Sequence, residues 1–227
     1  MRYIKPVLVL AMAGALAAAC GADTMPSEAG AGDTGTPLPV AVTGPQSDVV
    51  ARGDGDALRI TPIPPAGATV QQKVEHALRE DILSKVRVVG TTSATCPDGI
   101  TMKAGAVSQC VVTYEGAEIP YEVKISDRYE DGDRVFSYTK EPKKALLVAK
   151  VVYHQLNESY GAESGRTDAS KLACAEFPVA KALEFGADTG LTCQYWSKYG
   201  KDGEPGYVTL KVSMGKRGYG VGFEEIR

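Results

Sequence analysis

The sequence predicts an α+β protein of two tandem repeats, each with one amphipathic helix packed on a small antiparallel sheet and closed by one disulfide. Two observations support this prediction. A shift of 78 positions places Cys96 on Cys174, and a shift of 83 places Cys110 on Cys193. In each half, apolar residues at helical spacing precede the first cysteine, and alternating strand-like residues follow.

The composition sets bounds on size and partners. The 227 residues are enough for one ordinary domain or two small ones. The formal net charge of −3 lacks the basic excess typical of nucleic-acid binding, so no nucleic-acid partner is expected. Of the five cysteines, four belong to the two repeat pairs, which leaves Cys20 to be explained.

Residues 1–19 have the pattern of an export signal. Arg2 and Lys5 precede an apolar run, residues 7–19, that is too short to span a bilayer. The following Leu-Ala-Ala-Ala-Cys-Gly resembles the lipobox of bacterial lipoproteins, although Ala17 stands where leucine is usual. The resemblance implies that Cys20 becomes a lipidated N-terminus on the outer face of the cell membrane. An ordinary signal peptide with an incidental cysteine is the alternative.

Residues 20–66 are predicted to be a disordered linker between the lipid anchor and the folded part. The segment from residue 21 onward contains no aromatic residue and is rich in Gly, Pro, Ala, Thr and Asp. Such a composition buries too little apolar surface to offset the entropy lost on ordering. The first repeat is then expected over residues 67–141 and the second over residues 142–227.

The first repeat opens with a helix signal. Thr69-Val70-Gln71-Gln72 is a capping-box pattern, and the apolar residues that follow lie on one helical face until Gly90 breaks the pattern. These residues are Val70, Val74, Ala77, Leu78 and Ile82. From residue 107 the period changes to two, which predicts strands over residues 107–115, 117–126 and 134–140.

The second repeat is predicted to follow the same plan. Its helix is expected to begin at Pro142, a residue favoured in the first helical turn, and to end at Gly161. The apolar stripe comprises Ala145, Val148, Ala149, Val152 and Leu156. Strands are expected over residues 191–199, 207–213 and 219–226.

The cysteines are predicted to form the disulfides Cys96–Cys110 and Cys174–Cys193. Exported proteins keep disulfides, and an ancestral single copy must have closed its own bridge. Pairing across the repeats and a four-cysteine metal site remain as alternatives. The metal site is disfavoured because the chain has no Cys-x-x-Cys pair.

Residues 69–140 resemble a domain of unknown function common in actinobacterial lipoproteins and membrane proteins. The resemblance rests on the helix, on Cys96-Pro97-Asp98-Gly99, and on Gly105 and Cys110. The second repeat departs from it, since Ala175 replaces the proline after the first cysteine. That family has no established activity, so the resemblance implies a fold and an extracellular location but no chemistry.

A second resemblance is architectural. Secreted β-lactamase-inhibitor proteins also pair two helix-plus-sheet repeats, each with one disulfide, although their Gly-Met-Thr helix-entry motif is missing here. This resemblance implies an alternative function as a proteinaceous inhibitor of a secreted hydrolase.

The sequence offers no pattern typical of an enzyme or of a metal site. His76 and His154 occupy equivalent helix positions without a His-Glu-x-x-His motif, and the acidic turn of residues 127–133 lacks EF-hand spacing. We therefore expect no catalytic residues, no metal and no cofactor. The expected function is non-catalytic binding of an envelope or secreted protein, or of a glycan.

Aromatic residues in the last strands are the candidate binding residues. They are Trp196, Tyr195, Tyr199, Tyr207 and Tyr219. Strand alternation places Trp196 beside polar residues and opposite Tyr195, so an exposed Trp196 could anchor a partner. The alternative is that these rings pack the interface between the two repeats.

Overall fold

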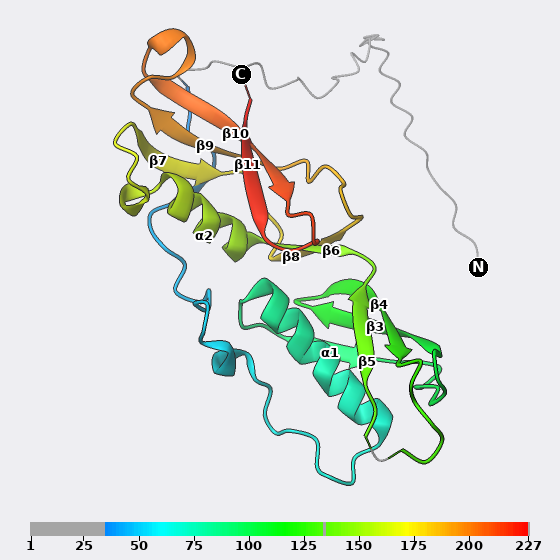
Figure 1. Cartoon of the computed structure of the whole chain (residues 1–227). Helices are drawn as coiled ribbons and strands as arrows, with labels where there is room; N and C mark the ends of the chain where they lie inside the picture. Colours follow the sequence, from blue (N-terminus) through cyan, green and yellow to red (C-terminus); the bar gives the residue numbers. More distant parts are fainter. Residues whose placement is uncertain (1–34, 134, 227) are drawn as a thin grey trace, which may run out of the picture. The chain divides into compact units, whose positions relative to one another are not determined.

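The computed structural model describes residues 35–133 and 135–226, and these residues form a mixed helix-and-sheet fold (Figure 1). The predicted export signal, Cys20 and Arg134 lie outside the described residues. Within them, two α-helices accompany three antiparallel sheets. The predicted α+β class is therefore confirmed. None of the described helices is long and apolar enough to cross a membrane.

The first helix, α1 (Val70–Val86), begins at the predicted capping box. The Thr69 hydroxyl accepts a hydrogen bond from the Gln72 amide at 3.2 Å, and the Gln72 side chain accepts one from the Thr69 amide at 2.9 Å. These bonds satisfy amides that the first helical turn leaves without partners. The helix ends at Arg87, whose backbone is left-handed (φ 58°), before the predicted break at Gly90.

A four-stranded sheet follows α1, with the strand order β2-β3-β4-β5. The three strands predicted after residue 107 are confirmed with adjusted bounds, whereas the short β2 was not predicted. The hairpin between β3 and β4 turns at Glu115 and Gly116, which both have positive φ, as two-residue type I′ hairpin turns require. The strands are β2 Thr92–Thr95, β3 Val107–Tyr114, β4 Ala117–Ile125 and β5 Tyr138–Pro142.

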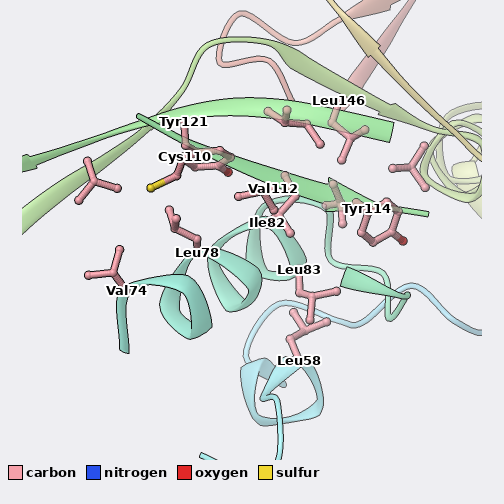
Figure 2. Close-up of a cluster of buried hydrophobic side chains, with 14 of the residues drawn as sticks. Leu58, Val74, Leu78, Ile82, Leu83, Cys110, Val112, Tyr114, Tyr121 and Leu146 are labelled. Atoms are coloured by element: carbon pink, nitrogen blue, oxygen red, sulfur yellow. The ribbon is translucent and has the colours of Figure 1, made fainter. Parts of the chain in front are cut away.

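The first core lies between α1 and this sheet (Figure 2). Leu78 and Ile82 of α1 are at most 3% exposed and pack in the same cluster as Val112 of β3 and Tyr121 of β4. Burying one such aliphatic side chain stabilises the fold by roughly 1.5–3 kcal/mol. The predicted stripe of α1 is therefore the element that holds the helix on the sheet.

Strand β6 (Ala145–Val148) corrects the predicted start of the second helix. The apolar pattern predicts a helix from Pro142, but Pro142 ends β5, and β6 pairs with β8 (Ala180–Leu183). Every residue of β6 is buried: Leu146 belongs to the first core and Leu147 to the second. The prediction was wrong because a strand buried on both faces is apolar at every position, as a buried helix segment also is.

The second helix, α2 (Ala149–Tyr160), covers a five-stranded sheet with the order β1-β7-β9-β10-β11. The remaining stripe residues Ala149, Val152 and Leu156 are buried. Gly161 follows the helix as predicted, with its amide donating to the Asn157 carbonyl at 2.8 Å. Strands β1 and β7 of this sheet were not predicted, whereas the three predicted strands match β9, β10 and β11 with adjusted bounds. The strands are β1 Val40–Val42, β7 Ala169–Cys174, β9 Thr192–Ser197, β10 Gly206–Met214 and β11 Val221–Glu225. Short 3-10 helices span Gly55–Leu58, Ala162–Ser164 and Lys201–Gly203.

Part of the segment predicted as a disordered linker is folded. Strand β1 (Val40–Val42) pairs with β7, and Val42 is 6% exposed in the second core. Leu58 is 7% exposed in the first core (Figure 2). The prediction was wrong for these residues because average composition does not report whether a few apolar side chains find tertiary partners.

Both predicted disulfides are present. Cys96, just after β2, bonds to Cys110 of β3, and Cys174 of β7 bonds to Cys193 directly opposite on β9. All four cysteines are at most 2% exposed. Pairing across the two halves and a four-cysteine metal site are both excluded by these bonds.

Candidate binding surfaces

The five aromatic residues predicted to bind a partner do not form one surface. Tyr195 is 2% exposed in the second core, whereas Trp196, the next residue of β9, is on the opposite face of the sheet. Tyr199 is 73% exposed in the turn after β9. Tyr219, in the turn between β10 and β11, lies under the ammonium group of Lys85 on α1, 5.7 Å from its ring centroid.

Tyr195 is a structural residue, and its prediction as a contact residue was wrong. Its hydroxyl donates to the Glu225 carboxylate at 2.8 Å, and its ring stacks on Tyr160 with 4.7 Å between centroids. The guanidinium of Arg166 lies 4.9 Å from the same ring centroid. Burial, followed by the hydrogen bond to Glu225, raises the pKa of Tyr195 to about 12. Tyr195 therefore packs α2 onto the sheet.

Trp196 and Tyr207 lie on the sheet face turned away from α2. Their ring centroids are 5.0 Å apart in an edge-to-face arrangement, and the Lys171 ammonium lies 4.9 Å from the Trp196 ring centroid. The strand register aligns Ser170, Trp196 and Tyr207 in one row across β7, β9 and β10. We call this face the Trp196 surface, defined by Trp196, Tyr207, Lys171, Ser170, Gln194 and Thr209.

Gln194 leaves an amide group without a partner on the Trp196 surface. The register places it between Ala173 of β7 and Thr209 of β10. Gln194 is 6% exposed, and its Nε2 atom has no hydrogen-bond partner among the described residues. Buried amides in folded proteins nearly always have a partner. Because this atom is enclosed, it is a cost to the stability of the fold and not a contact that an external ligand reaches.

A second surface, which the sequence did not indicate, is a groove of about 510 Å³. Its walls are residues 92–94 of β2, the side of α1 that carries Arg79, and the proline-rich residues 62–65. We call it the β2 groove. Ile63 on its rim is 71% exposed. The groove was not predicted because it depends on β2 lying at the edge of its sheet. The order of the strands in a sheet cannot be derived from the sequence of a single strand.

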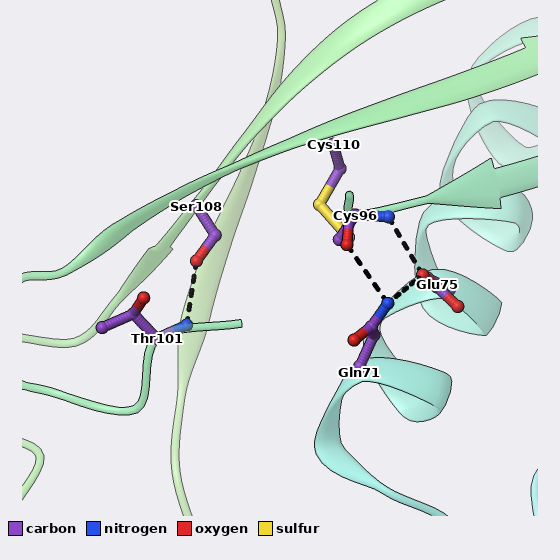
Figure 3. Close-up of a disulfide and its surroundings, with 6 residues drawn as sticks. All are labelled: Gln71, Glu75, Cys96, Thr101, Ser108 and Cys110. Carbon is purple, nitrogen blue, oxygen red and sulfur yellow. Dashed lines mark hydrogen bonds between the residues drawn. A yellow bond between two sulfur atoms is a disulfide. The ribbon is translucent and has the colours of Figure 1, made fainter. Parts of the chain in front are cut away.

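Arg79 and Glu75, two charged residues of the β2 groove, differ in their hydrogen-bond and ion-pair partners. Arg79 is partly buried, and its Nε donates to the Thr92 hydroxyl at 3.3 Å. No described carboxylate lies close enough to Arg79 to form an ion pair. Glu75 already accepts hydrogen bonds from Gln71 and from the Cys96 amide (Figure 3). Arg79 is thus a cation in the groove that lacks an anionic partner among the described residues.

The two histidines each sit near a glutamate one helical turn further on. The His76–Glu80 pair is 4.0 Å apart and the His154–Glu158 pair 3.3 Å. The Nε2 atom of His76 is also 3.1 Å from the Ile60 carbonyl. Within residues 35–133 and 135–226, no group of three or more His, Cys, Asp or Glu side chains is placed to hold a metal ion.

Comparison with known proteins places one domain family on the chain. Residues 65–130 match the family described as "Domain of unknown function (DUF4333)". This match covers α1, β2, β3 and β4, together with the Cys96–Cys110 disulfide. The chain matched no curated protein and no solved structure. The family match therefore locates a domain of unknown function over the part of the chain that holds most of the β2 groove.

Proposed function

We propose that this chain is a lipid-anchored lipoprotein of the outer face of an actinobacterial cell membrane, acting there as a non-catalytic binding module. Residues 1–19 and Cys20 support the export and anchoring parts of the proposal. The two buried disulfides favour an oxidising, extracytoplasmic location. The resemblance of residues 69–140 to domains of actinobacterial lipoproteins agrees with this location.

The same proposal takes the two halves of the chain as divergent tandem copies of one unit. In the first half α1 precedes β2 to β5, and the disulfide joins the end of β2 to β3. In the second half α2 precedes β7 and β9 to β11, and the disulfide joins β7 to β9. The matching order of helix, first strand, disulfide and meander supports duplication.

We place the binding site on the Trp196 surface, with an envelope or secreted protein as its partner. The observation that carries this assignment is the edge-to-face pair of the partly exposed Trp196 and Tyr207 rings, with the Lys171 ammonium beside the Trp196 ring. Trp and Tyr side chains supply large contact areas at low entropic cost and concentrate in the energetic centres of protein interfaces. In this proposal the partner packs on the rings of Trp196 and Tyr207.

The test is capture from a native envelope extract with the full-length chain as bait. Trp196→Ala and Tyr207→Ala baits run in parallel, with Phe185→Ala as the control because Phe185 is an exposed aromatic residue (47%) outside the surface. We expect a stoichiometric protein that Trp196→Ala and Tyr207→Ala lose and Phe185→Ala retains. If the unmodified chain and all three variants capture the same partner, the binding site does not lie on the Trp196 surface. Co-sedimentation with cell walls without protein capture would indicate a glycan instead.

A further inference from the structure

The open edge of β2 is the starting observation for a second binding site. β2 ends the order β2-β3-β4-β5, so only one side of the strand is paired within its sheet. The Glu115 amide donates to the Thr91 carbonyl at 3.0 Å, which makes Thr91 and Glu115 a hydrogen-bonded pair of the antiparallel ladder. Such pairs alternate along the ladder, so Ser93 also points its backbone groups toward β3. The amides and carbonyls of Thr92 and Ala94 then point out of the sheet.

Cys96, the next residue whose backbone groups point out of the sheet, is hydrogen-bonded to α1. The Cys96 amide donates to Glu75 at 3.0 Å, and the Cys96 carbonyl accepts from Gln71 at 3.2 Å (Figure 3). Two side chains of α1 thus take the place of a neighbouring strand for Cys96. Within the described residues, no hydrogen bond reaches the outward amides and carbonyls of Thr92 and Ala94. These two residues leave an edge that can accept another strand.

The space beside this edge has the size and shape for an extended chain. The β2 groove of about 510 Å³ is bounded by residues 92–94 on one side and by α1 and residues 62–65 on the other. Three of the four residues in segment 62–65 are prolines, which lack the amide donor that a paired strand needs. The segment therefore forms an apolar wall, with Ile63 on its rim, and does not occupy the edge itself.

The charges of the groove indicate which chain fits. Arg79 lies at the Thr92 end, bonded to the Thr92 hydroxyl and without a described carboxylate partner. Glu75 lies at the Cys96 end, where its carboxylate is already bonded. A guanidinium binds a carboxylate through two parallel hydrogen bonds, and this geometry is specific for anionic groups. The favoured ligand has a carboxylate near Thr92 and an apolar side chain near Ile63.

We propose that the β2 groove binds an extended peptide segment of another protein, which adds a strand to the edge of β2 and places an acidic residue against Arg79. The outward amides and carbonyls of Thr92 and Ala94 pair with the peptide backbone. This site is separate from the Trp196 surface, and each proposal stands if the other fails.

The test selects ligands for the full-length chain from a displayed library of short random linear peptides. Enriched peptides should share an Asp or Glu and an aliphatic residue. Arg79→Gln should weaken their binding by at least about tenfold, because hydrogen bonds to charged groups contribute more than neutral ones. The peptide affinity of Arg79→Lys should lie between those of Arg79→Gln and the unmodified chain, since lysine keeps the charge but loses the paired donors. The controls are Arg128→Gln, which removes an exposed cation elsewhere, and Trp196→Ala.

Ala94→Pro tests the backbone pairing directly. Proline at position 94 removes one outward amide and leaves the ladder to β3 intact, so peptide affinity should fall about three- to tenfold. Circular dichroism verifies the fold of this variant. In the unmodified chain, peptide binding should slow hydrogen exchange at the Thr92 and Ala94 amides. Failure to enrich peptides, or equal binding by Arg79→Gln and the unmodified chain, would overturn the proposal. A homodimer that Ala94→Pro dissociates would assign the edge to a second copy of this chain.

Discussion

The carboxylate of Glu75 on α1 accepts a hydrogen bond from the backbone amide of Cys96, with 3.0 Å between the two atoms (Figure 3). The same oxygen accepts a bond from Gln71 at 2.8 Å, and Gln71 in turn donates to the Cys96 carbonyl. Since Cys96 also forms the disulfide to Cys110, this triangle joins the helix, the edge of the sheet and the cross-link at one point.

Replacing Glu75 by alanine should destabilise the protein by about 1–3 kcal/mol, because the partly buried Cys96 amide and the Gln71 side chain lose their acceptor. Urea unfolding of the two proteins measures the difference. Glu118→Ala, which removes an exposed carboxylate from β4, is the matched control and should change the stability by less than about 0.5 kcal/mol. Equal effects of the two substitutions would show that the Glu75 bonds contribute nothing specific.

Replacing Gln194 by leucine should separate stability from binding. The buried Nε2 atom lacks a partner among the described residues, so removing it should stabilise the free protein by about 1 kcal/mol. Thermal unfolding without ligand gives this value. The variant should at the same time retain the partner captured by the unmodified chain, because the enclosed amide makes no contact with it. A destabilised variant would mean that the amide has a partner in the folded protein, such as a bound water.

Replacing Leu58 by alanine tests whether the folded part extends into the segment predicted as a linker. Leu58 is 7% exposed in the first core, so its truncation should cost about 2–5 kcal/mol. Val135→Ala provides the control, since Val135 is 86% exposed. Denaturant midpoints are sufficient to compare the three proteins. An unchanged midpoint for Leu58→Ala would indicate that residues 55–58 belong to the linker and not to the folded part.

Tyr195 predicts a specific loss of stability in alkali. Its pKa rises from 10.0 to about 12 in the folded protein, first through burial and then through Glu225. A raised folded pKa means that the contribution is complete below about pH 10 and is lost as the pH rises through 12. The stability difference between the unmodified chain and Tyr195→Phe should therefore be constant below pH 10 and shrink above it. A difference that does not vary with pH would contradict this, and Tyr199→Phe, at a 73% exposed position, is the control.

Replacing Cys20 by alanine should release the protein from membranes if the proposed anchoring is correct. Each buried methylene of an acyl chain contributes about 0.8 kcal/mol, so two or more chains hold a protein firmly. Fractionation and labelling with a radioactive fatty acid measure the effect. The Cys96→Ser/Cys110→Ser double variant controls for loss of cysteine as such and should keep its label. If Cys20→Ala still incorporates the fatty acid, the lipid is not attached to Cys20 and the proposed anchoring is wrong.

The features that could be predicted from the sequence are those decided by near neighbours. The capping box at Thr69, the apolar stripe of α1 and the Glu115-Gly116 hairpin depend on residues a few positions apart. The two disulfides could also be predicted, because the repeated cysteine pattern assigns one pair to each half of the chain, at sequence separations of 14 and 19. In these cases the residues that decide the structure lie close together in the sequence.

Tertiary structure alone decided the features that depend on distant partners. The run from Ala145 is a strand because β8 pairs with it between the two cores, with Ala145 opposite Leu183. Val42 is buried because β7 accepts it, although the surrounding composition is typical of a linker. The β2 groove exists because nothing in the sheet pairs with the outer side of β2. Which strand becomes an edge, and which apolar residue finds a core, is set by contacts between segments far apart in the chain, and a single sequence does not record those contacts.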